Sequence, residues 1–255
     1  MVGADRHMST KPLPFLNRWL KFAQLALWPG ICICCARPSG LSIDLCQSCA
    51  NLLPRVEAPC PGCGLPLPLG HSPGVRCGAC SVRSRPIYRT RAPFAWRTPV
   101  SSLISGYKYH DRLHYGRVMA SQWLEELRDS YGEDELPQLL IPVPLHPRRL
   151  RQRGYNQALL LAQQWGEALN IPAGTSLVAR VRDTPAQQGL DAAHRKRNLR
   201  KAFIVKDPQA LADYRRIALV DDVLTTMSTV DTLARVISRA APHELEIHAW
   251  ALARA

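Results

Sequence analysis

The spacing of the cysteines constrains the fold of this chain more than any other feature of its sequence. All nine cysteines of the 255 residues lie in one N-terminal segment, and eight of them form four Cys-x-x-Cys pairs. The pairs are Cys32 with Cys35, Cys46 with Cys49, Cys60 with Cys63, and Cys77 with Cys80. A Cys-x-x-Cys turn presents two thiolates to one metal ion, and two such turns complete a tetrahedral site. The spacing therefore predicts two structural metal sites in a segment that holds few other core residues.

Zinc is the metal that this set of ligands favours. Joining the first turn with the second and the third with the fourth is the simplest pairing, but an interleaved pairing satisfies the same spacing. An iron–sulfur cluster takes the same four thiolates and is the chemical alternative. A disulfide framework explains the pattern poorly, because a cytosolic chain keeps its thiols reduced. The ninth cysteine, Cys34, is predicted to be a free thiol. Each filled zinc site carries a net charge of −2, so two sites lower the formal charge to about +9.

Composition narrows the class of protein. With 46% apolar residues the chain has enough material for a core, so wholesale disorder is excluded. The most apolar N-terminal stretch, residues 13–28, is interrupted by Arg18 and Lys21. It also lacks the pattern of a secretory signal, so no membrane span is expected and the predicted location is the cytoplasm.

The formal net charge of +13 is uneven along the chain. One basic cluster comprises Arg148, Arg149, Arg151 and Arg153, and a second comprises Arg195, Lys196, Arg197, Arg200 and Lys201. Such clusters attract polyanions, among them nucleic acid, pyrophosphate and phosphorylated sugars. A solvated basic surface is the plain alternative for either cluster taken alone.

Segments with strand and helix character alternate after the cysteine-rich region. Strands are expected over residues 91–96, 139–143, 176–181, 202–205, 216–220 and 245–252. Helices are expected over residues 13–28, 100–107, 115–128, 156–169 and 191–199, and between the strand at 216–220 and residue 240. This alternation predicts an α/β fold, a parallel sheet with helices on both faces. The predicted organisation is an N-terminal amphipathic helix (1–29), a double zinc ribbon (30–84) and the α/β domain (85–255).

The segment from Ile217 to Thr229 carries the strongest signal for a ligand. Four apolar residues predict a buried strand, and Asp221 and Asp222 follow it directly. In open α/β sheets, ligands bind at the carboxyl ends of the strands. A turn rich in hydroxyl groups then enters a helix, whose free amides and dipole favour a phosphate. Because carboxylates suit the hydroxyls of a sugar, this one segment fits both ends of a ribose 5-phosphate.

Other phosphate and metal motifs are absent or imperfect. The chain has neither the GxxxxGK[ST] loop of nucleotide triphosphatases nor the GxGxxG turn of dinucleotide-binding proteins. His243 and His248 are five residues apart, whereas a zincin helix requires four. A Walker-B-like strand, or simply a capped helix, is the plain alternative for the segment 217–229.

That segment resembles the phosphoribosyl pyrophosphate motif of type I phosphoribosyltransferases. The resemblance implies that Asp221 and Asp222 hold the 2′ and 3′ hydroxyls of the ribose and serve the reaction. It also implies that the hydroxyl-rich turn cradles the 5′-phosphate. The residues of that turn are Thr225, Thr226, Met227, Ser228 and Thr229.

The order of motifs along the whole chain narrows the resemblance further. The cysteine turns come first, followed by Tyr-Lys-Tyr at 107–109, Ile-Pro-Val-Pro-Leu at 141–145 and Arg-Gln-Arg-Gly-Tyr-Asn-Gln at 151–157. Thr-Pro-Ala-Gln-Gln-Gly-Leu at 184–190 precedes Arg195, Asn198 and the ribose-phosphate motif. In this order the chain is similar to the ComF family, the relatives of ComFC and GntX, from about residue 28 onward. That family combines a double zinc ribbon with a phosphoribosyltransferase-like domain.

The ComF resemblance implies a phosphoribosyltransferase-like protein that binds phosphoribosyl pyrophosphate with magnesium, and transfer of the phosphoribosyl group to an acceptor. Residues 142–149 correspond to the pyrophosphate loop, where Arg148 and Arg149 face the anion. Residues 182–200 correspond to a hood that closes over substrate, with Arg195 and Lys196 as charge partners for the departing pyrophosphate. Cations at one end and carboxylates at the other suit the charges that develop in such a transfer.

A second function of a different class stays open. In that interpretation the chain is a non-catalytic accessory protein for DNA uptake in competence. The zinc ribbons and arginine clusters then bind single-stranded DNA, and a competence helicase or recombination proteins are the partners. A structural adaptor, supported by the zinc ribbons alone, is a third interpretation.

One residue departs from the family's pattern. The phosphate turn usually reads Thr-Thr-Gly, and Met227 stands at the glycine. Glycine there permits a close approach of the backbone to the phosphate or a positive φ. A methionine is compatible with phosphate binding where its side chain points away from the turn. The alternative is that it weakens phosphate binding severely, which would affect catalysis more than the fold.

Overall fold

The computed structural model describes residues 30–40, 43–68, 70, 72, 74–131, 135–183 and 201–255, which fall into two compact units. The first unit ends at Leu52 and the second spans Leu53–Ala255. The helices predicted at 13–28 and 191–199 lie outside the described residues. The second four-cysteine segment belongs to the same compact unit as the sheet. The predicted boundaries at 29/30 and 84/85 stay predictions.

The described residues of the first unit form one short helix and a tight turn. The turn is closed by a bridge between Ile31 and Pro38, and the Cys32 amide donates to the Arg37 carbonyl at 2.8 Å. Helix α2 (Gln47–Asn51) begins directly after Cys46. Few apolar side chains of the described residues 30–40 and 43–52 are buried, so cross-linking by a metal is a source of folding free energy for this part of the unit.

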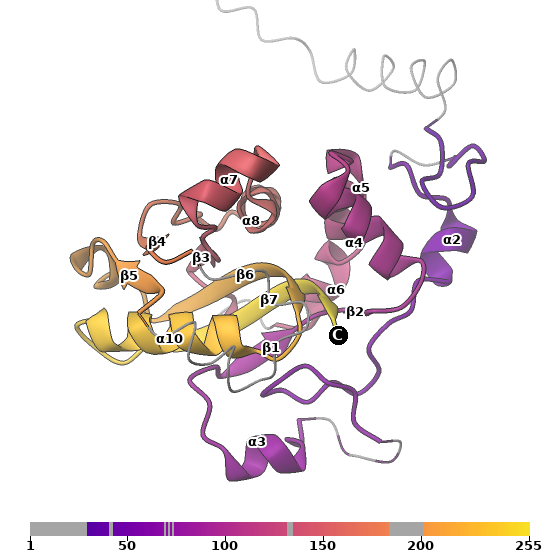
Figure 1. Cartoon of the computed structure of the whole chain (residues 1–255). Helices are drawn as coiled ribbons and strands as arrows, with labels where there is room; N and C mark the ends of the chain where they lie inside the picture. The colour runs from indigo at the N-terminus through magenta and orange to yellow at the C-terminus, as the bar shows by residue number, and fades with distance from the viewer. Residues whose placement is uncertain are drawn as a thin grey trace, which may run out of the picture. The chain divides into compact units, whose positions relative to one another are not determined.

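The second unit is built on a sheet whose described strand pairs are all parallel (Figure 1). The strand order is β1-β7-β6-β3, and β2 extends the pairing of β7 beyond β1. The strands are β1 (Arg89–Arg91), β2 (Phe94–Ala95), β3 (Leu139–Pro142), β6 (Arg216–Leu224) and β7 (Glu246–Arg254). The strand predicted over 91–96 is divided into two because Pro93, between them, has no amide to donate to the ladder.

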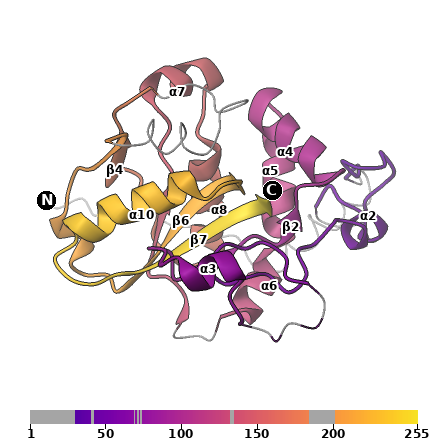
Figure 2. The ribbon, with the colours of Figure 1, turned by 60° about the horizontal axis from the view of Figure 1, so that its bottom comes forward.

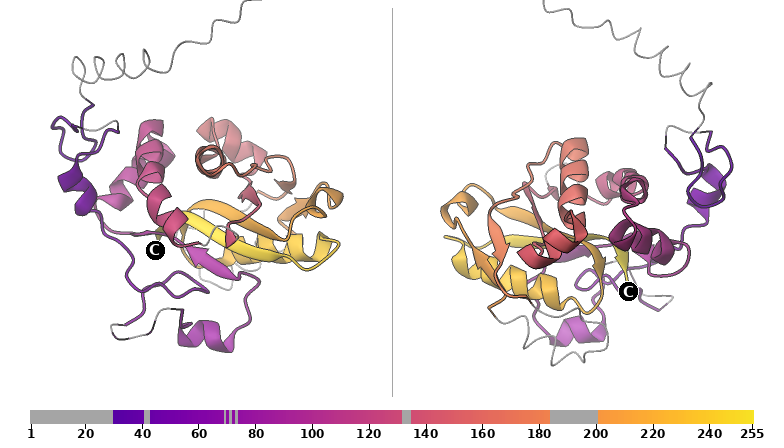
Figure 3. Two further views of the ribbon diagram at one scale, coloured as in Figure 1. Left: turned by 180° about the vertical axis from the view of Figure 1, so that it is seen from behind. Right: turned by 45° about the horizontal axis from the view of Figure 1, so that its top comes forward.

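Helices cover both faces of this sheet, which confirms the predicted fold class. In Figures 1 and 2, α10 (Ser228–Ala240) and α3 (Gly78–Val82) lie on one side of β6 and β7, and α8 (Gln157–Leu169) lies on the other. The view from behind in Figure 3 shows α4 on the same side as α7 and α8. The remaining helical bounds are α4 (Val100–Tyr109), α5 (Leu113–Ser121), α6 (Leu124–Asp129), α7 (Pro147–Arg153) and the 3₁₀ turn η2 (Gln209–Leu211).

Alternation along the strands assigns side chains to the two faces. On the α10 face, Ile217, Leu219 and Ala249 pack with Leu233 and Ile237 in one apolar cluster. On the α8 face, Trp250 packs edge-on against Trp123 and Trp165, with ring centroids 5.8 and 6.2 Å away. All three indole rings are almost fully buried. The two cores fix the strand register, because a slip by one residue would exchange the two faces.

Two sequence predictions about the elements are wrong. The segments at 176–181 and 202–205 do not join the parallel sheet. They form β4 (Val178–Arg180) and β5 (Phe203–Val205), which pair antiparallel with each other in a separate two-stranded sheet. The helix predicted over 115–128 is two helices, because the chain turns near Trp123 and places that ring in the tryptophan cluster.

No helix among the described residues is both long and apolar enough to cross a membrane.

Candidate functional site

The paired carboxylates, Asp221 and Asp222, lie where strand β6 extends beyond the end of its neighbour β3. Strand β3 ends where Pro142 pairs with Val220, but β7 continues beside β6 as far as Leu224. Strand β6 therefore runs through Asp221 and Asp222 rather than ending before them, which corrects the predicted strand end. Beyond the end of β3, no strand among the described residues lies beside the two carboxylates on that edge. Their backbone is held by β7 on the other side, where Asp221 pairs with Ala251.

A lysine from α4 neutralises one carboxylate. The Lys108 Nζ atom is 2.8 Å from the Asp222 Oδ1 atom, and the two side chains are 18% and 9% exposed. Lys108 also lies near the face of the Trp96 ring, 6.0 Å from its centroid. Burial acts to lower the pKa of Lys108, but the charges of Asp222 and Asp221 raise it above its ordinary value. The ammonium group therefore remains charged in the site.

The neighbouring carboxyl group titrates near neutrality. Burial and the charge of Asp222 raise the pKa of Asp221 to about 7, although Lys108, the Asp222 amide and Arg180 act to lower it. The Asp222 amide donates to the Asp221 Oδ1 atom at 2.9 Å. Asp221 thus exchanges a proton close to physiological pH, and the pair offers both a donor and an acceptor for the hydroxyls of a ligand.

The hydroxyl-rich turn leads from β6 into α10. Thr225 and Thr226 are exposed, and the Thr226 and Ser228 hydroxyls are 2.9 Å apart. Met227 adopts a left-handed conformation, with φ of 63° and ψ of −3°, at the cap of α10. Its side chain is 2% exposed and packs in the apolar core with Val230. The side chain therefore points away from the turn, the condition under which methionine is compatible with a phosphate site.

A cavity of about 620 Å³ joins these groups. Its wall combines three carboxylates, the pair on β6 and Asp111, with four cationic side chains, and it also includes polar groups from α8. The charged residues of this wall are Lys108, Asp111, Arg149, Arg153, Arg180, Asp221 and Asp222. A small hollow formed by residues 223–230 adjoins the cavity, because Asp221 and Thr229 line both. Sugar hydroxyls and phosphate groups are the ligand chemistry that this wall matches.

The predicted arginine loop is partly helical. Pro147 starts α7, so Arg148 and Arg149 lie in its first turn rather than in an open loop. The Arg149 side chain lines the cavity, whereas Arg148 is 68% exposed and lies 3.4 Å from Asp183. Asp183 is also 3.9 Å from Arg149. Arg195 and Lys196, predicted as further charge partners, lie outside the described residues.

The structure adds two cations that the sequence did not single out as site residues. Lys108 belongs to the Tyr-Lys-Tyr motif, so a signal was present, but its pairing with Asp222 depends on the docking of α4. Arg180 lies at the end of β4 and is 8% exposed. Burial and the charge of Arg149 lower the pKa of Arg180, while Asp221 and Asp183 raise it. A lone arginine in a short strand gives no sequence signal for such a role.

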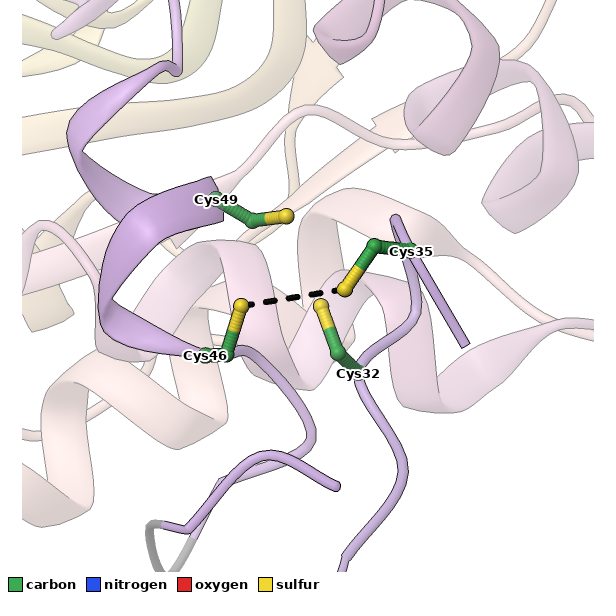
Figure 4. A group of neighbouring side chains, drawn as sticks. All are labelled: Cys32, Cys35, Cys46 and Cys49. Atoms are coloured by element: carbon green, nitrogen blue, oxygen red, sulfur yellow. Dashed lines mark hydrogen bonds between the residues drawn. The ribbon is translucent and has the colours of Figure 1, made fainter. Parts of the chain in front are cut away.

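The first cysteine cluster lies in the N-terminal unit (Figure 4). The sulfurs of Cys32, Cys35, Cys46 and Cys49 lie within 4.8 Å of one another and point toward a common centre. Burial acts to raise the pKa of Cys32, but hydrogen bonds from backbone amides of Cys46, Cys35 and Cys34 lower it to about 6. A thiolate stabilised in this way suits a metal ion. Cys34 stays outside the cluster, as predicted, and burial raises its pKa to about 11.

The second cysteine cluster lies in the unit that contains the sheet. Its members, Cys60, Cys63, Cys77 and Cys80, also lie within 4.8 Å of one another. The Cys77 amide donates to the Cys60 sulfur at 3.2 Å, and three of the four side chains are buried. The first turn therefore pairs with the second and the third with the fourth, which resolves the alternative left by the spacing. Both clusters have the ligand number and proximity that a tetrahedral metal ion requires.

The structure thus defines a parallel α/β protein with two four-cysteine clusters and a charged cavity at the sheet edge. Competence protein F of Haemophilus influenzae is 39% identical over 159 residues, covering 62% of this chain and 69% of that protein. DNA utilization protein YhgH of Salmonella typhi is 35% identical over 231 residues, covering 89% and 97%. Competence protein ComFC of Bacillus subtilis is 24% identical over 197 residues, covering 76% and 77%.

The chain belongs to the ComF family of competence and DNA utilization proteins, as its motif order predicted. No family model matches it. Among solved structures, a purine phosphoribosyltransferase from Pyrococcus horikoshii matches with a TM-score of 0.30 and 15% identity, covering 54% of this chain and 80% of that one. A superposition this loose adds nothing to the strand order described above.

Proposed function

We propose that this protein binds phosphoribosyl pyrophosphate with magnesium in the cavity at the end of β6. The observation that supports this proposal is the pairing of Asp221 and Asp222 with the hydroxyl-rich turn at the start of α10. Carboxylates suit the ribose hydroxyls, and the first amides of a helix suit the 5′-phosphate. Arg149 and Arg180, across the cavity, suit the pyrophosphate.

The same arrangement suits transfer of the phosphoribosyl group. In that reaction the bond between C1 of the ribose and the pyrophosphate oxygen breaks, and the acceptor forms a bond to C1. The electron pair of the broken bond leaves with pyrophosphate, toward the cations of the cavity. Lys108 holds Asp222 in place, so that the carboxylates stay fixed while positive charge develops on the ribose. Magnesium, when bound, would neutralise pyrophosphate oxygens.

We further propose that both cysteine clusters hold zinc. Four thiolates without a nitrogen or oxygen ligand favour zinc in a structural site, and hydrogen bonds from backbone amides stabilise the charged sulfurs. Elemental analysis should give two zinc ions per chain. A brown protein with visible absorption would show an iron–sulfur cluster instead.

Calorimetric titration of the metal-loaded protein with phosphoribosyl pyrophosphate, with and without magnesium, tests the ligand. The wild type should bind, and Asp221→Asn with Asp222→Asn should abolish binding while both metals are retained. Asp213→Asn, an exposed carboxylate remote from the cavity wall, is the matched control and should bind like the wild type. Retained binding in the double variant would refute the ribose assignment.

Binding of single-stranded DNA is the second candidate function. Tyr109 is 62% exposed at the cavity, and the Arg153 guanidinium carbon lies over its ring, 5.2 Å from the centroid. An exposed aromatic ring beside cationic groups is a stacking platform for bases. The relatives named for competence and DNA utilization agree with such a ligand.

Fluorescence titration with a labelled oligonucleotide tests this candidate. Replacement of Arg148, Arg149, Arg151 and Arg153 by alanine should weaken binding and flatten its salt dependence, because fewer counterions are released. Tyr109→Ala should weaken binding without changing the salt slope. Tyr88→Ala, an exposed tyrosine outside the cavity, is the control. Unchanged affinity and slope in the arginine variant would exclude that cluster.

A further inference from the structure

A buried arginine joins the second cysteine cluster to the proposed phosphate turn. Arg254 is the last residue of β7 and is 6% exposed. Its Nε atom donates to the Cys63 carbonyl at 2.6 Å, and its Nη1 atom donates to the Leu224 carbonyl at 2.8 Å and to the Thr225 carbonyl. One guanidinium group therefore contacts the backbone of the metal ligand Cys63 and also the backbone of Leu224 and Thr225, where the chain enters the turn Thr225–Thr229.

The charge of this arginine lies beside the cysteine cluster. The Arg254 Nη1 atom also donates to an oxygen of Ala255, and among the described residues no side-chain carboxylate forms an ion pair with Arg254. A filled four-cysteine site with a divalent ion carries a charge of −2. A buried cation beside such a dianion is stabilised, whereas the same cation beside neutral thiols is not.

A second arginine, Arg85, connects the region after the cysteine cluster to the start of helix α10. The Arg85 Nη1 atom is 2.6 Å from the Asp231 Oδ2 atom, and the two side chains are 15% and 13% exposed. Asp231 lies in the first turn of α10, where its amide donates to the Met227 carbonyl at 2.9 Å. Arg85 follows α3, the helix that contains Cys80, by three residues, and its guanidinium holds the start of α10.

We propose that the metal ion of the second cluster orders the turn Thr225–Thr229 through Arg254 and Arg85, which act as positioning residues. The metal holds Cys63 in place and keeps the four cysteines as thiolates, which supply the negative charge. Arg254 holds the carbonyls of Leu224 and Thr225, and Arg85 holds the first turn of α10. Loss of this metal loosens the turn before it unfolds the sheet. This inference rests on the proposed function in one respect, which is the assignment of the turn Thr225–Thr229 as the phosphate subsite.

Simple packing is the competing explanation. Cys60, Cys63 and Cys80 belong to the same apolar core as Met227 and Val230, so loss of the metal could weaken the whole unit evenly. The two explanations differ for variants that keep every metal ligand. Packing predicts a uniform effect on the unit, whereas the arginine connection predicts an effect confined to residues 224–231.

Hydrogen exchange measured by mass spectrometry on the full, metal-loaded chain separates them. Arg254→Gln and Arg85→Gln should retain the metal content of the wild type but exchange amides of residues 224–231 at least tenfold faster, with α8 unchanged. Arg91→Gln is the matched control, a partly buried arginine of β1 whose interactions do not include the cysteine cluster. Unchanged exchange at 224–231, or equal acceleration in α8, would overturn the proposal.

A double-variant cycle tests the dependence on the metal itself. Cys77→Ser should loosen residues 224–231 as Arg254→Gln does, and the two changes together should add little to either alone, because both break the same connection. Additive effects would overturn the proposal. Where a glutamine or serine variant does not fold, Arg254→Lys is the deciding variant, because lysine keeps the charge but cannot donate to the Cys63 and Leu224 carbonyls at the same time. This variant should retain the metal and show faster hydrogen exchange at residues 224–231. Exchange at the wild-type rate would overturn the proposal.

Phosphoribosyl pyrophosphate titration of the same variants tells the two proposals apart. If the wild type binds, Arg254→Lys should bind at least tenfold more weakly with the metal content unchanged. If the wild type does not bind, the proposed ligand is wrong, and the exchange measurements still decide whether the metal orders the turn.

Discussion

At the scale of single residues, Met227 shows how a departure from the family's pattern is accommodated. A non-glycine residue in the left-handed region costs about 1–2 kcal/mol. Burial of a methionine side chain contributes about 2–5 kcal/mol, judged by truncation to alanine. Because the side chain is 2% exposed within the core, burial outweighs the strain. The buried Met227 side chain therefore anchors the turn to the core, and the backbone amides of the turn remain available to a ligand.

We expect Met227→Gly to destabilise the protein by about 1–3 kcal/mol, although it restores the family's glycine. The relief of backbone strain is smaller than the loss of the buried side chain. Urea unfolding followed by tryptophan fluorescence measures the difference. Stabilisation by the glycine would show that strain at this turn exceeds the contribution of the side chain.

The raised pKa of Asp221 predicts a pH dependence of stability. With a folded pKa of about 7 against 3.8 in the unfolded chain, the folded state holds its proton more tightly. Its contribution to stability is full below pH 4 and is lost as pH rises through about 7. Asp221→Asn should therefore stabilise the protein by about 4 kcal/mol at pH 8 and by less than about 1 kcal/mol at pH 4. Thermal unfolding at the two pH values measures this, and an equal effect at both would contradict the assignment.

At the scale of elements, the site depends on the docking of α4 against β6. The Lys108–Asp222 ion pair is the contact that joins them at the cavity, and both side chains are largely buried. Removing one partner of a buried pair leaves an uncompensated charge. The sequence placed Asp222 correctly because the carboxylates follow a run of apolar residues. It could not place Lys108, since only the three-dimensional docking brings the two together.

Lys108→Met should cost about 2–4 kcal/mol in the free energy of unfolding, because Asp222 is then buried without its cation. The double variant Lys108→Met with Asp222→Asn should recover part of this loss, because it leaves no unpaired charge. Urea titrations of the single and double variants give the coupling energy, and Lys206→Met, on an exposed lysine, is the control. A coupling energy of zero would mean that the pair does not contribute to stability.

For the other elements too, features set by the local sequence were predicted, whereas features set by contacts between distant segments were not. The bounds of α8 and α10 follow from apolar periodicity and local caps, such as the Asn156 side chain that accepts from the Ala158 amide at 3.1 Å. The separate β4–β5 sheet was missed because a short apolar run does not reveal which strand it pairs with. Helix α7 was missed because the family resemblance assigned residues 142–149 to a loop, although Pro147 and Gly154 mark the two ends of the helix.

At the scale of the whole molecule, the two cysteine clusters are equal in sequence but unequal in structure. The first lies in the unit that ends at Leu52, where few of the described residues are buried. The second shares its core with the sheet and with α10. The spacing of the cysteines predicted both sites but not this difference, because spacing carries no information about which core surrounds a cluster. The contribution of each metal to stability should differ accordingly.

We expect Cys46→Ser to remove one metal ion per chain and to leave the thermal unfolding of residues 53–255 within about 2 °C of the wild type. Cys77→Ser should also remove one metal ion, but it should lower that transition by more than about 10 °C, because the metal anchors residues of the core. Elemental analysis gives the metal content. Tryptophan fluorescence follows the sheet unit, since Trp123, Trp165 and Trp250 are buried against it. Equal shifts of the unfolding temperature in the two variants would contradict this prediction. They would mean that both clusters stabilise residues 53–255.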